Sequence, residues 1–432
     1  MFHKKTKNAK SMRPLQELTP ILPASVMLAD VKRADLLSLM KQHSGLEPVR
    51  FEKLCLSLIH NLIHHCQSLP ETTNSHYSAP CGLVDHALQR TEAALALFRE
   101  VIVIEEELSE EQKLWMYALF TAGILQNIGK LSIDFEVFLY DANGQLLKPW
   151  SPLLEKMTGT AHYYDYEFKA EGDANVRQRL NLLLARFLMP ASGYAWIVSN
   201  DDVLAVWLAL LSDDEQGAGS LAAILSRADA IAVMRYFDEL LIKNTARRTG
   251  RQGRISTFVD NRPDEGFSKD TIMGVEFIQW LTKQLASGKI SINNLHVFVV
   301  AGGMLISPEL FKMYAKDFPQ NKNLQAIQKG VLSLGIHQVG ADGNAMTRVD
   351  GGAGQKMRTG ILISNYAMIL PEKMQFKQAK TGELVTVSAL ELVHMMQAKQ
   401  SSPGGIRQLS KAGAWDLLSD SKQQSMRTSY SG

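Results

Sequence analysis

The chain has 432 residues, of which 46% are hydrophobic and 21% charged, a composition that supports buried cores in about two domains. Its 46 Lys and Arg against 44 Asp and Glu give a formal charge of +2, which excludes a globally polycationic DNA-wrapping protein but permits a local basic face. No run reaches the ~18 apolar residues of a membrane span, and no apolar signal core follows the basic start. Three cysteines without a C-x-x-C spacing argue against a disulfide frame or a zinc knuckle. We therefore expect a cytoplasmic protein without membrane insertion.

The first half of the chain reads as helical. Residues 1–19 form a basic, flexible arm, and a helical period dominates residues 20–245. Ser109 and Gln112 make a capping-box pattern before one apolar stripe. Phe135, Val137 and Leu139 alternate with their neighbours and precede Asn143-Gly144, so we expect a short β-hairpin within the helical domain.

The second half changes character. Residues 246–270 read as a basic linker, whose arginines are candidate DNA-binding residues, although a solvated hinge explains them equally well: Arg247, Arg248, Arg251 and Arg254. Residues 271–375 read as helix, strand, helix, helix, strand, with Pro308 opening a helix and a β-like run from Thr359 to Met368. That order is expected of a winged helix-turn-helix variant. Residues 376–432 read as a helix and a disordered tail. The fold class is thus mainly α, followed by a small α+β winged-helix-like domain.

Three phrases contain the candidate catalytic residues. Ser75–Leu88 includes His76 and His86, Ala122–Leu131 includes Gln126, Asn127 and Lys130, and Leu225–Ala230 includes Asp229. Each has a plainer explanation as well. His86 fits a hydrogen-bonded core residue, His76 a surface residue and Asp229 an ion-pair partner of Arg227 or Arg235, while the two amides fit a helix C-terminus. His60 and His64 have the i, i+4 spacing of helical metal ligands, but a half-exposed helix face explains them too.

Together the three phrases resemble the HD-hydrolase layout, in which histidines and aspartates meet at one divalent metal. More specifically, the chain resembles the MobH-class TraI relaxase family of conjugative plasmids and integrative conjugative elements. Further markers are Leu22-Pro23-Ala24-Ser25, Lys148-Pro149-Trp150-Ser151-Pro152, Gly274–Leu281 and Leu305–Glu309.

This resemblance implies an HD-like relaxase domain over residues 20–245 and a TraI C-terminal domain over residues 271–375. It implies a DNA nickase homologue that binds transfer-origin DNA, with a conjugative coupling protein or relaxosome subunits as partners. It further implies that His76, His86 and Asp229 ligate a divalent metal (Mn, Mg, Fe or Zn) that activates water or a phosphoryl oxygen.

The departures from the family put cleavage in doubt. The family has His-Asp where this chain has Gln126-Asn127, and it tends to carry a second histidine at Tyr77. Amides are poor ligands for transition metals, so the metal is expected to be weakly bound or absent. Three interpretations stay open: the site is dead and the fold binds DNA or a partner, the three ligands and waters hold a metal, or another histidine such as His64 completes the site.

The alternatives in function are a non-catalytic DNA-binding or scaffolding protein derived from the relaxase fold, and an HD-type nucleotide phosphohydrolase. The sequence contains no G-x-x-x-x-G-K-[ST] phosphate loop, so nothing in it favours a helicase.

Overall fold

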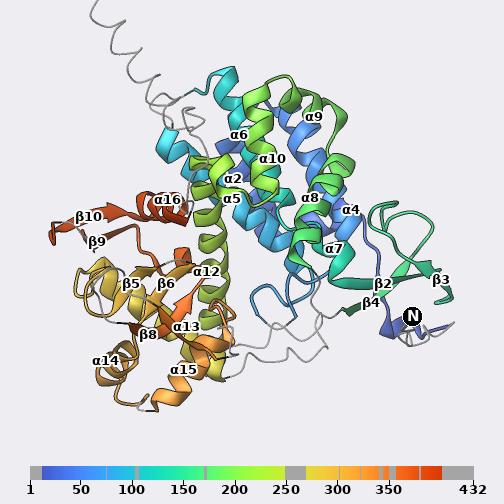
Figure 1. Cartoon of the computed structure of the whole chain (residues 1–432). Coiled ribbons are helices and arrows are strands. Elements are labelled where there is room, and N and C mark those ends of the chain that lie inside the picture. The colour runs from blue at the N-terminus through green and yellow to red at the C-terminus, as the bar shows by residue number, and fades with distance from the viewer. Residues whose placement is uncertain are drawn as a thin grey trace, which may run out of the picture. The chain divides into compact units, whose positions relative to one another are not determined.

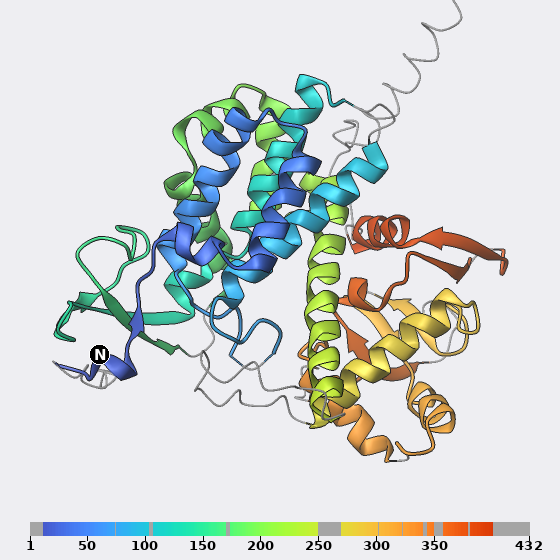
Figure 2. The same ribbon diagram turned by 180° about the vertical axis from the view of Figure 1, so that it is seen from behind.

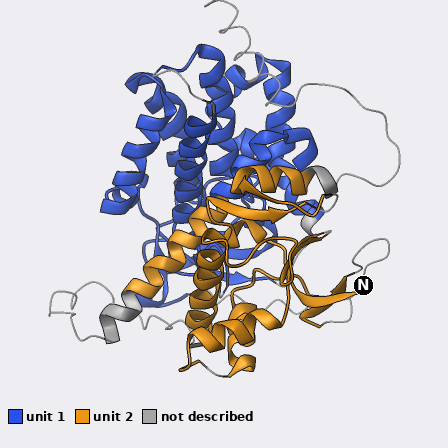
Figure 3. Ribbon diagram, turned by 90° about the vertical axis from the view of Figure 1, so that its left-hand side faces the viewer, with its two compact units in different colours: residues 1–73, 77–228, 412–432 blue, residues 74–76, 229–411 orange. Residues whose placement is uncertain are grey.

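The computed structural model describes residues 12–73, 75–102, 107–169, 173–248, 269–300, 302–321, 323–339, 344–349, 357–378 and 381–400. These residues divide into two compact units, coloured separately in Figure 3. Unit 1 takes the described residues up to Thr73 and Tyr77–Ala228. Unit 2 takes Ser75, His76 and those from Asp229 onward.

Unit 1 is a helical domain (Figures 1 and 2). Its core helix is α6 (Glu110–Leu125), in which every residue from Met116 to Leu125 is buried. The Ser109–Gln112 capping box starts this helix as predicted. Around α6 pack α2 (Val31–Ser44), α4 (Ser57–Cys66), α5 (Gly82–Ile102), α9 (Ala191–Val198) and α10 (Asp201–Leu211). The remaining helices of this part are α1 (Ala24–Leu28), α3 (Pro48–Phe51) with the π-helical turn Glu52–Leu56, α7 (Lys130–Ile133), α8 (Ala174–Leu188), α11 (Glu215–Ala218) and the start of α12 (Ser220–Arg248).

The predicted hairpin of unit 1 is confirmed and extended. Strand β2 (Phe135–Tyr140) pairs with β3 (Leu146–Pro149) across a turn in which Gly144 has a left-handed φ of 77°. Two further strands, β4 (Tyr163–Phe168) and β1 (Thr19–Pro20), complete an antiparallel sheet of order β1-β4-β2-β3. The hairpin is therefore half of a four-stranded sheet. Part of the predicted arm borders it, since Arg13 pairs with Asp165, while residues 1–11 lie outside the described residues.

The described residues of unit 2 form two antiparallel sheets. Strands β5 (Val297–Val300), β6 (Gly303–Ile306), β8 (Arg358–Ile363) and β7 (Met346–Val349) form one sheet in that order, and β9 (Lys373–Lys377) pairs with β10 (Leu384–Ser388). The helices are the rest of α12 from Asp229, α13 (Lys269–Ala286), α14 (Glu309–Asp317), α15 (Leu324–Ser333) and α16 (Ala389–Gln400). A Cβ on Gly274 would lie 2.2 Å from the carbonyl oxygen of Gly330, so glycines allow α13 and α15 to approach closely.

The fold class predicted from the sequence, mainly α followed by a small α+β part, agrees with this architecture. Pro308 precedes α14 as expected. The β-like run ends early, because Tyr366–Ile369 form a buried 3-10 turn after β8; a short, wholly buried apolar run does not reveal its period. The predicted domain boundary at residue 245 falls inside α12. The winged-helix character of the second part stays a prediction.

Among the described helices, none is singly long and apolar enough to cross a membrane, and one bent pair, α9 with α10, meets the length and composition of a span.

Candidate active site

The loop that leads into α5 folds back tightly on itself. The Glu71 amide donates to the Tyr77 carbonyl (2.8 Å), and the Cys81 amide donates to the Ser68 carbonyl (2.9 Å). A Cβ on Gly82 would lie 1.8 Å from the Tyr77 carbonyl oxygen, so only glycine fits this position. This turn fixes both Glu71 and the Tyr77 ring against α5.

His86 is buried on α5 between these two residues. The Tyr77 ring stacks on the imidazole with centroids 4.6 Å apart and an interplanar angle of 16°. The second neighbour is Glu71, whose Oε1 lies 3.5 Å from His86 Nδ1. Both His86 and Glu71 are buried, so the histidine contacts a carboxylate in a poorly solvated environment.

Lys130 supplies the countercharge. Its Nζ donates to Glu71 Oε1 (2.5 Å) and to the Glu71 carbonyl oxygen (2.8 Å). Burial by itself raises the pKa of the Glu71 carboxyl, but the charge of Lys130 and the hydrogen bond and charge of His86 outweigh it. The pKa of Glu71 is therefore held well below its ordinary value. The centre is a buried ion pair with an imidazole beside it.

The turn that carries Gln126 and Asn127 is held through its backbone. Arg90, one helical turn after His86, donates to the carbonyl oxygens of Gly123 (2.9 and 3.0 Å) and Gln126 (3.3 Å). Asn127 has a left-handed φ of 63°, which asparagine tolerates better than most residues. Asn181 of α8 accepts a hydrogen bond from the Gly129 amide (2.7 Å). The turn thus leads directly to Lys130.

The predicted site residues are divided between the units. His86, Gln126, Asn127 and Lys130 belong to unit 1, and His76 and Asp229 belong to unit 2. Within unit 2, His76 Nδ1 lies 3.2 Å from Ser75 Oγ, which donates to the Leu334 carbonyl (2.9 Å). Asp229 is half-buried on α12. Their joint role as metal ligands with His86 stays a prediction.

The basic linker lies almost wholly outside the described residues. Arg247 and Arg248 are the last two residues of α12, and Arg251 and Arg254 lie beyond the described part. Sequence reasoning missed Glu71 and Arg90. The usable signal was Lys130 itself, because a buried lysine needs an acidic partner.

The predicted site residues in unit 1, together with Glu71, fit a divalent metal poorly. Gln126 and Asn127 are neutral amides, and the Glu71 carboxylate is already neutralised by Lys130. The described residues include no group of three or more His, Cys, Asp or Glu side chains that could hold a metal ion. A metal bound at His86 would therefore need ligands other than Glu71, Gln126 and Asn127.

His60 and His64 do not supply the missing metal ligands. His60 and His64 are half-buried on α4 with ring centroids 6.4 Å apart. Burial lowers the pKa of both, and the charge of Lys156 lowers that of His64 further. A neutral imidazole can ligate a metal, but the neighbouring ammonium repels any cation bound there.

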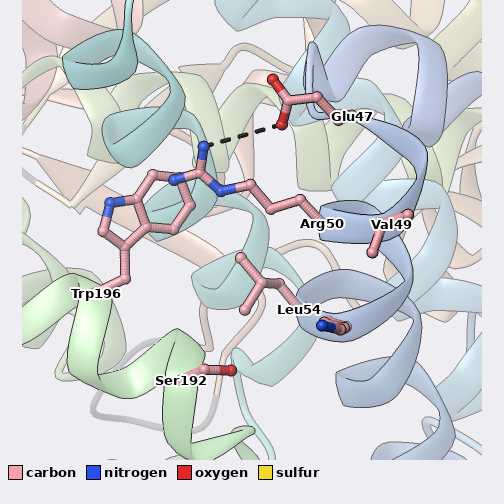
Figure 4. A pocket seen from close by; sticks show the side chains of 7 residues that line it. Glu47, Val49, Arg50, Leu54, Ser192 and Trp196 are labelled. Carbon is pink, nitrogen blue, oxygen red and sulfur yellow. Dashed lines mark ion pairs between the residues drawn. The ribbon is translucent and has the colours of Figure 1, made fainter.

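A separate hollow of about 430 Å³ opens between α3 and α9 (Figure 4). The Arg50 guanidinium lies 3.9 Å above the Trp196 ring, and Val49 and Leu54 add apolar lining. Arg50 is paired with Glu110 (2.7 Å), so its charge is already compensated. Glu47 and Lys53 also line the hollow, so its lining is both apolar and charged.

Two family models match the chain. The model described as "Putative helicase" (TraI_2) matches residues 19–252, which is more than half of the chain. The model described as "Putative conjugal transfer nickase/helicase TraI C-term" (TraI_2_C) matches residues 272–381. No curated protein matches the chain. The resemblance found in the sequence is confirmed at the level of TraI, while the MobH class stays a prediction.

Proposed function

Because the chain belongs to the TraI-type relaxase family, whose role is relaxase-type DNA processing in conjugation, we propose that it binds transfer-origin DNA without cutting it. On this proposal the fold of an HD-type nickase is retained, and the centre around His86 has become a structural one.

The observation that carries this proposal is the Glu71–Lys130 ion pair beside His86. A metal that activates water needs anionic or imidazole ligands with lone pairs directed at it. Here the carboxylate that faces His86 is bound by the Lys130 ammonium. The two positions where the family has His-Asp supply amides. Glu71 and Lys130 satisfy each other, and the two amides leave a weak ligand set for a transition metal.

The DNA-binding part of the proposal rests on the family assignment and on basic residues. Lys312 and Lys316 are exposed one turn apart on α14 of unit 2, and the sequence adds the four arginines between residues 247 and 254. Binding through phosphates releases counterions, so the affinity is expected to fall steeply as salt rises. Bound partners in a relaxosome, or a coupling protein, would then bring the DNA-cutting activity.

The test uses supercoiled plasmid carrying the element's transfer region and an equal plasmid without it. We expect the protein to bind the first plasmid preferentially. Its affinity should fall by about tenfold or more between 50 and 200 mM salt. No nicked circles should form with Mn²⁺ or Mg²⁺. Nicking by the purified chain that is lost in His86→Ala, but kept in His43→Ala, would contradict the proposal. His43 is the matched control because its Nδ1 also faces a buried carboxylate, Glu92 at 3.7 Å.

A second arm tests the ligand argument. The double variant Gln126→His with Asn127→Asp restores the family pair, and calorimetric titration with MnCl₂ compares it with the natural chain. We expect binding only in the double variant. Equal binding in both would refute the ligand argument, and phosphate release from nucleotides by the natural chain would favour the phosphohydrolase alternative.

A further inference from the structure

Helix α8 presents an apolar stripe to solvent. Val176, Leu183 and Phe187 are 41%, 60% and 43% exposed, and Leu180 between them is half-buried. At 100° per residue these four positions fall within about 60° of the helix circumference. Large apolar residues scattered singly need no explanation, but a continuous row on one helix face is typical of an interaction surface.

A basic row runs beside this stripe. Arg179 and Arg186 are exposed and lie about two turns apart on the flank of Leu183. The Arg186 guanidinium sits 4.6 Å above the Tyr194 ring, which holds it next to the stripe. The surface therefore matches a segment with apolar side chains on one face and carboxylates beside them, the helix-in-groove mode of recognition.

A segment of that chemistry lies near the end of the given sequence, beyond the described residues. Residues 414–420 read Ala-Trp-Asp-Leu-Leu-Ser-Asp, with Trp415 and Leu418 at i, i+3 spacing. Asp416 and Asp420 are the only acidic residues from position 401 to the end. On a helix, Trp415 and Leu418 would share a face.

We propose that residues 414–420 dock on the α8 stripe of the same chain. Trp415 and Leu418 would cover Leu183 and Phe187, and the two aspartates would pair with Arg179 and Arg186. The docking buries apolar surface on both sides and joins opposite charges, which sets the orientation of the segment.

The position of this surface gives the docking a structural consequence. Other faces of α8 carry Asn181, which accepts from the Gly129 amide, and Arg177, which pairs with Asp134 (2.8 Å). A Cβ on Gly129 would lie 2.1 Å from the Arg177 carbonyl oxygen. One helix thus joins the proposed docking surface to the turn that carries Gln126, Asn127 and Lys130.

The experiment uses the full chain with a photoreactive benzoylphenylalanine in place of Trp415. After irradiation and proteolysis, mass spectrometry is expected to find cross-links within residues 176–187. The double variant Arg179→Glu with Arg186→Glu should reduce their yield about tenfold, and adding Asp416→Lys with Asp420→Lys should restore most of it. Leu183→Glu should abolish them, whereas Leu154→Glu, at a site 78% exposed outside the stripe, should not.

Mixing chains of natural and heavy isotope composition separates the possible occupants. Cross-links confined to chains of one mass support docking within a chain. Cross-links between light and heavy chains would assign the surface to a second copy and overturn the proposal. Cross-links that miss α8, or that persist unchanged in the double variant Arg179→Glu with Arg186→Glu, would overturn it as well.

Discussion

Replacing Lys130 by methionine tests whether the centre beside His86 is a structural ion pair. The change keeps most of the length and the apolar stem of the side chain and removes the ammonium that lies 2.5 Å from Glu71 Oε1. Both residues are buried, so Glu71 would keep its charge in a poorly solvated place or take up a proton. Either outcome costs stability at pH 7.

Removal of one partner from a buried ion pair costs about 3–5 kcal/mol, because the other charge is left uncompensated. We expect Lys130→Met to lower the free energy of unfolding of unit 1 by that amount. The pKa of Glu71 should rise, since the largest influence that lowers it is Lys130. The loss should therefore shrink as the pH falls and the carboxyl binds a proton. Glu71→Gln in the same chain should recover much of the loss.

The assay is urea unfolding followed by circular dichroism, with Lys148→Met as the matched control. Lys148 Nζ lies 2.7 Å from Glu155 Oε2, but that pair is half exposed, and surface pairs contribute about 0–1 kcal/mol. If Lys130→Met costs no more than Lys148→Met, or if Glu71→Gln adds to the loss instead of relieving it, the assignment of Lys130 as the countercharge is wrong.

Two further predictions concern the same unit. Burial lowers the pKa of His65 to about 4, so its neutral form stabilises the fold fully above pH 6.5, and that contribution is lost as the pH falls from 6.5 toward 4. By pH 4.5 the loss is about 2.5 kcal/mol, and urea titrations at pH 7.5 and 4.5 should show this part of the pH dependence missing in His65→Leu. Gly82→Ala should lower the midpoint of thermal unfolding, because the new Cβ meets the Tyr77 carbonyl oxygen. Gly159→Ala is the control, since nothing lies within 4 Å of its Cβ, and it should leave the midpoint unchanged. Equal midpoints for the two variants would contradict the tight turn.

The sequence predicts those parts of the fold that depend on local pattern. Period-2 alternation and Asn143-Gly144 are adjacent in the chain, and they identify the β2–β3 hairpin correctly. Strand β4 was missed because its pairing with β2 is non-local. Side-chain period does not reveal which distant strand completes a sheet.

In the candidate site, too, the sequence reveals the residues that stand in a local pattern and misses those that depend on tertiary packing. His86 and Lys130 stand in recognisable phrases, but Glu71 is a single acid in a polar loop, 59 positions before Lys130. Its importance arises from a turn made by Tyr77 and Cys81 with left-handed φ values of 52° and 68°. Neither residue type favours that conformation, so no local signal predicts the turn. Tertiary packing brings the acid to the lysine.

The geometry of the turn at Gln126 and Asn127 indicates that these two side chains can be exchanged while the fold persists. Arg90 holds the Gln126 carbonyl, and Asn181 holds the Gly129 amide, so the turn is fixed by backbone groups. Asn127 occupies a left-handed position that asparagine and aspartate both tolerate. Substitution at these two side chains therefore changes the chemistry of the centre without removing the contacts that shape it. Arg90→Met should destabilise the turn far more than Asn127→Asp does.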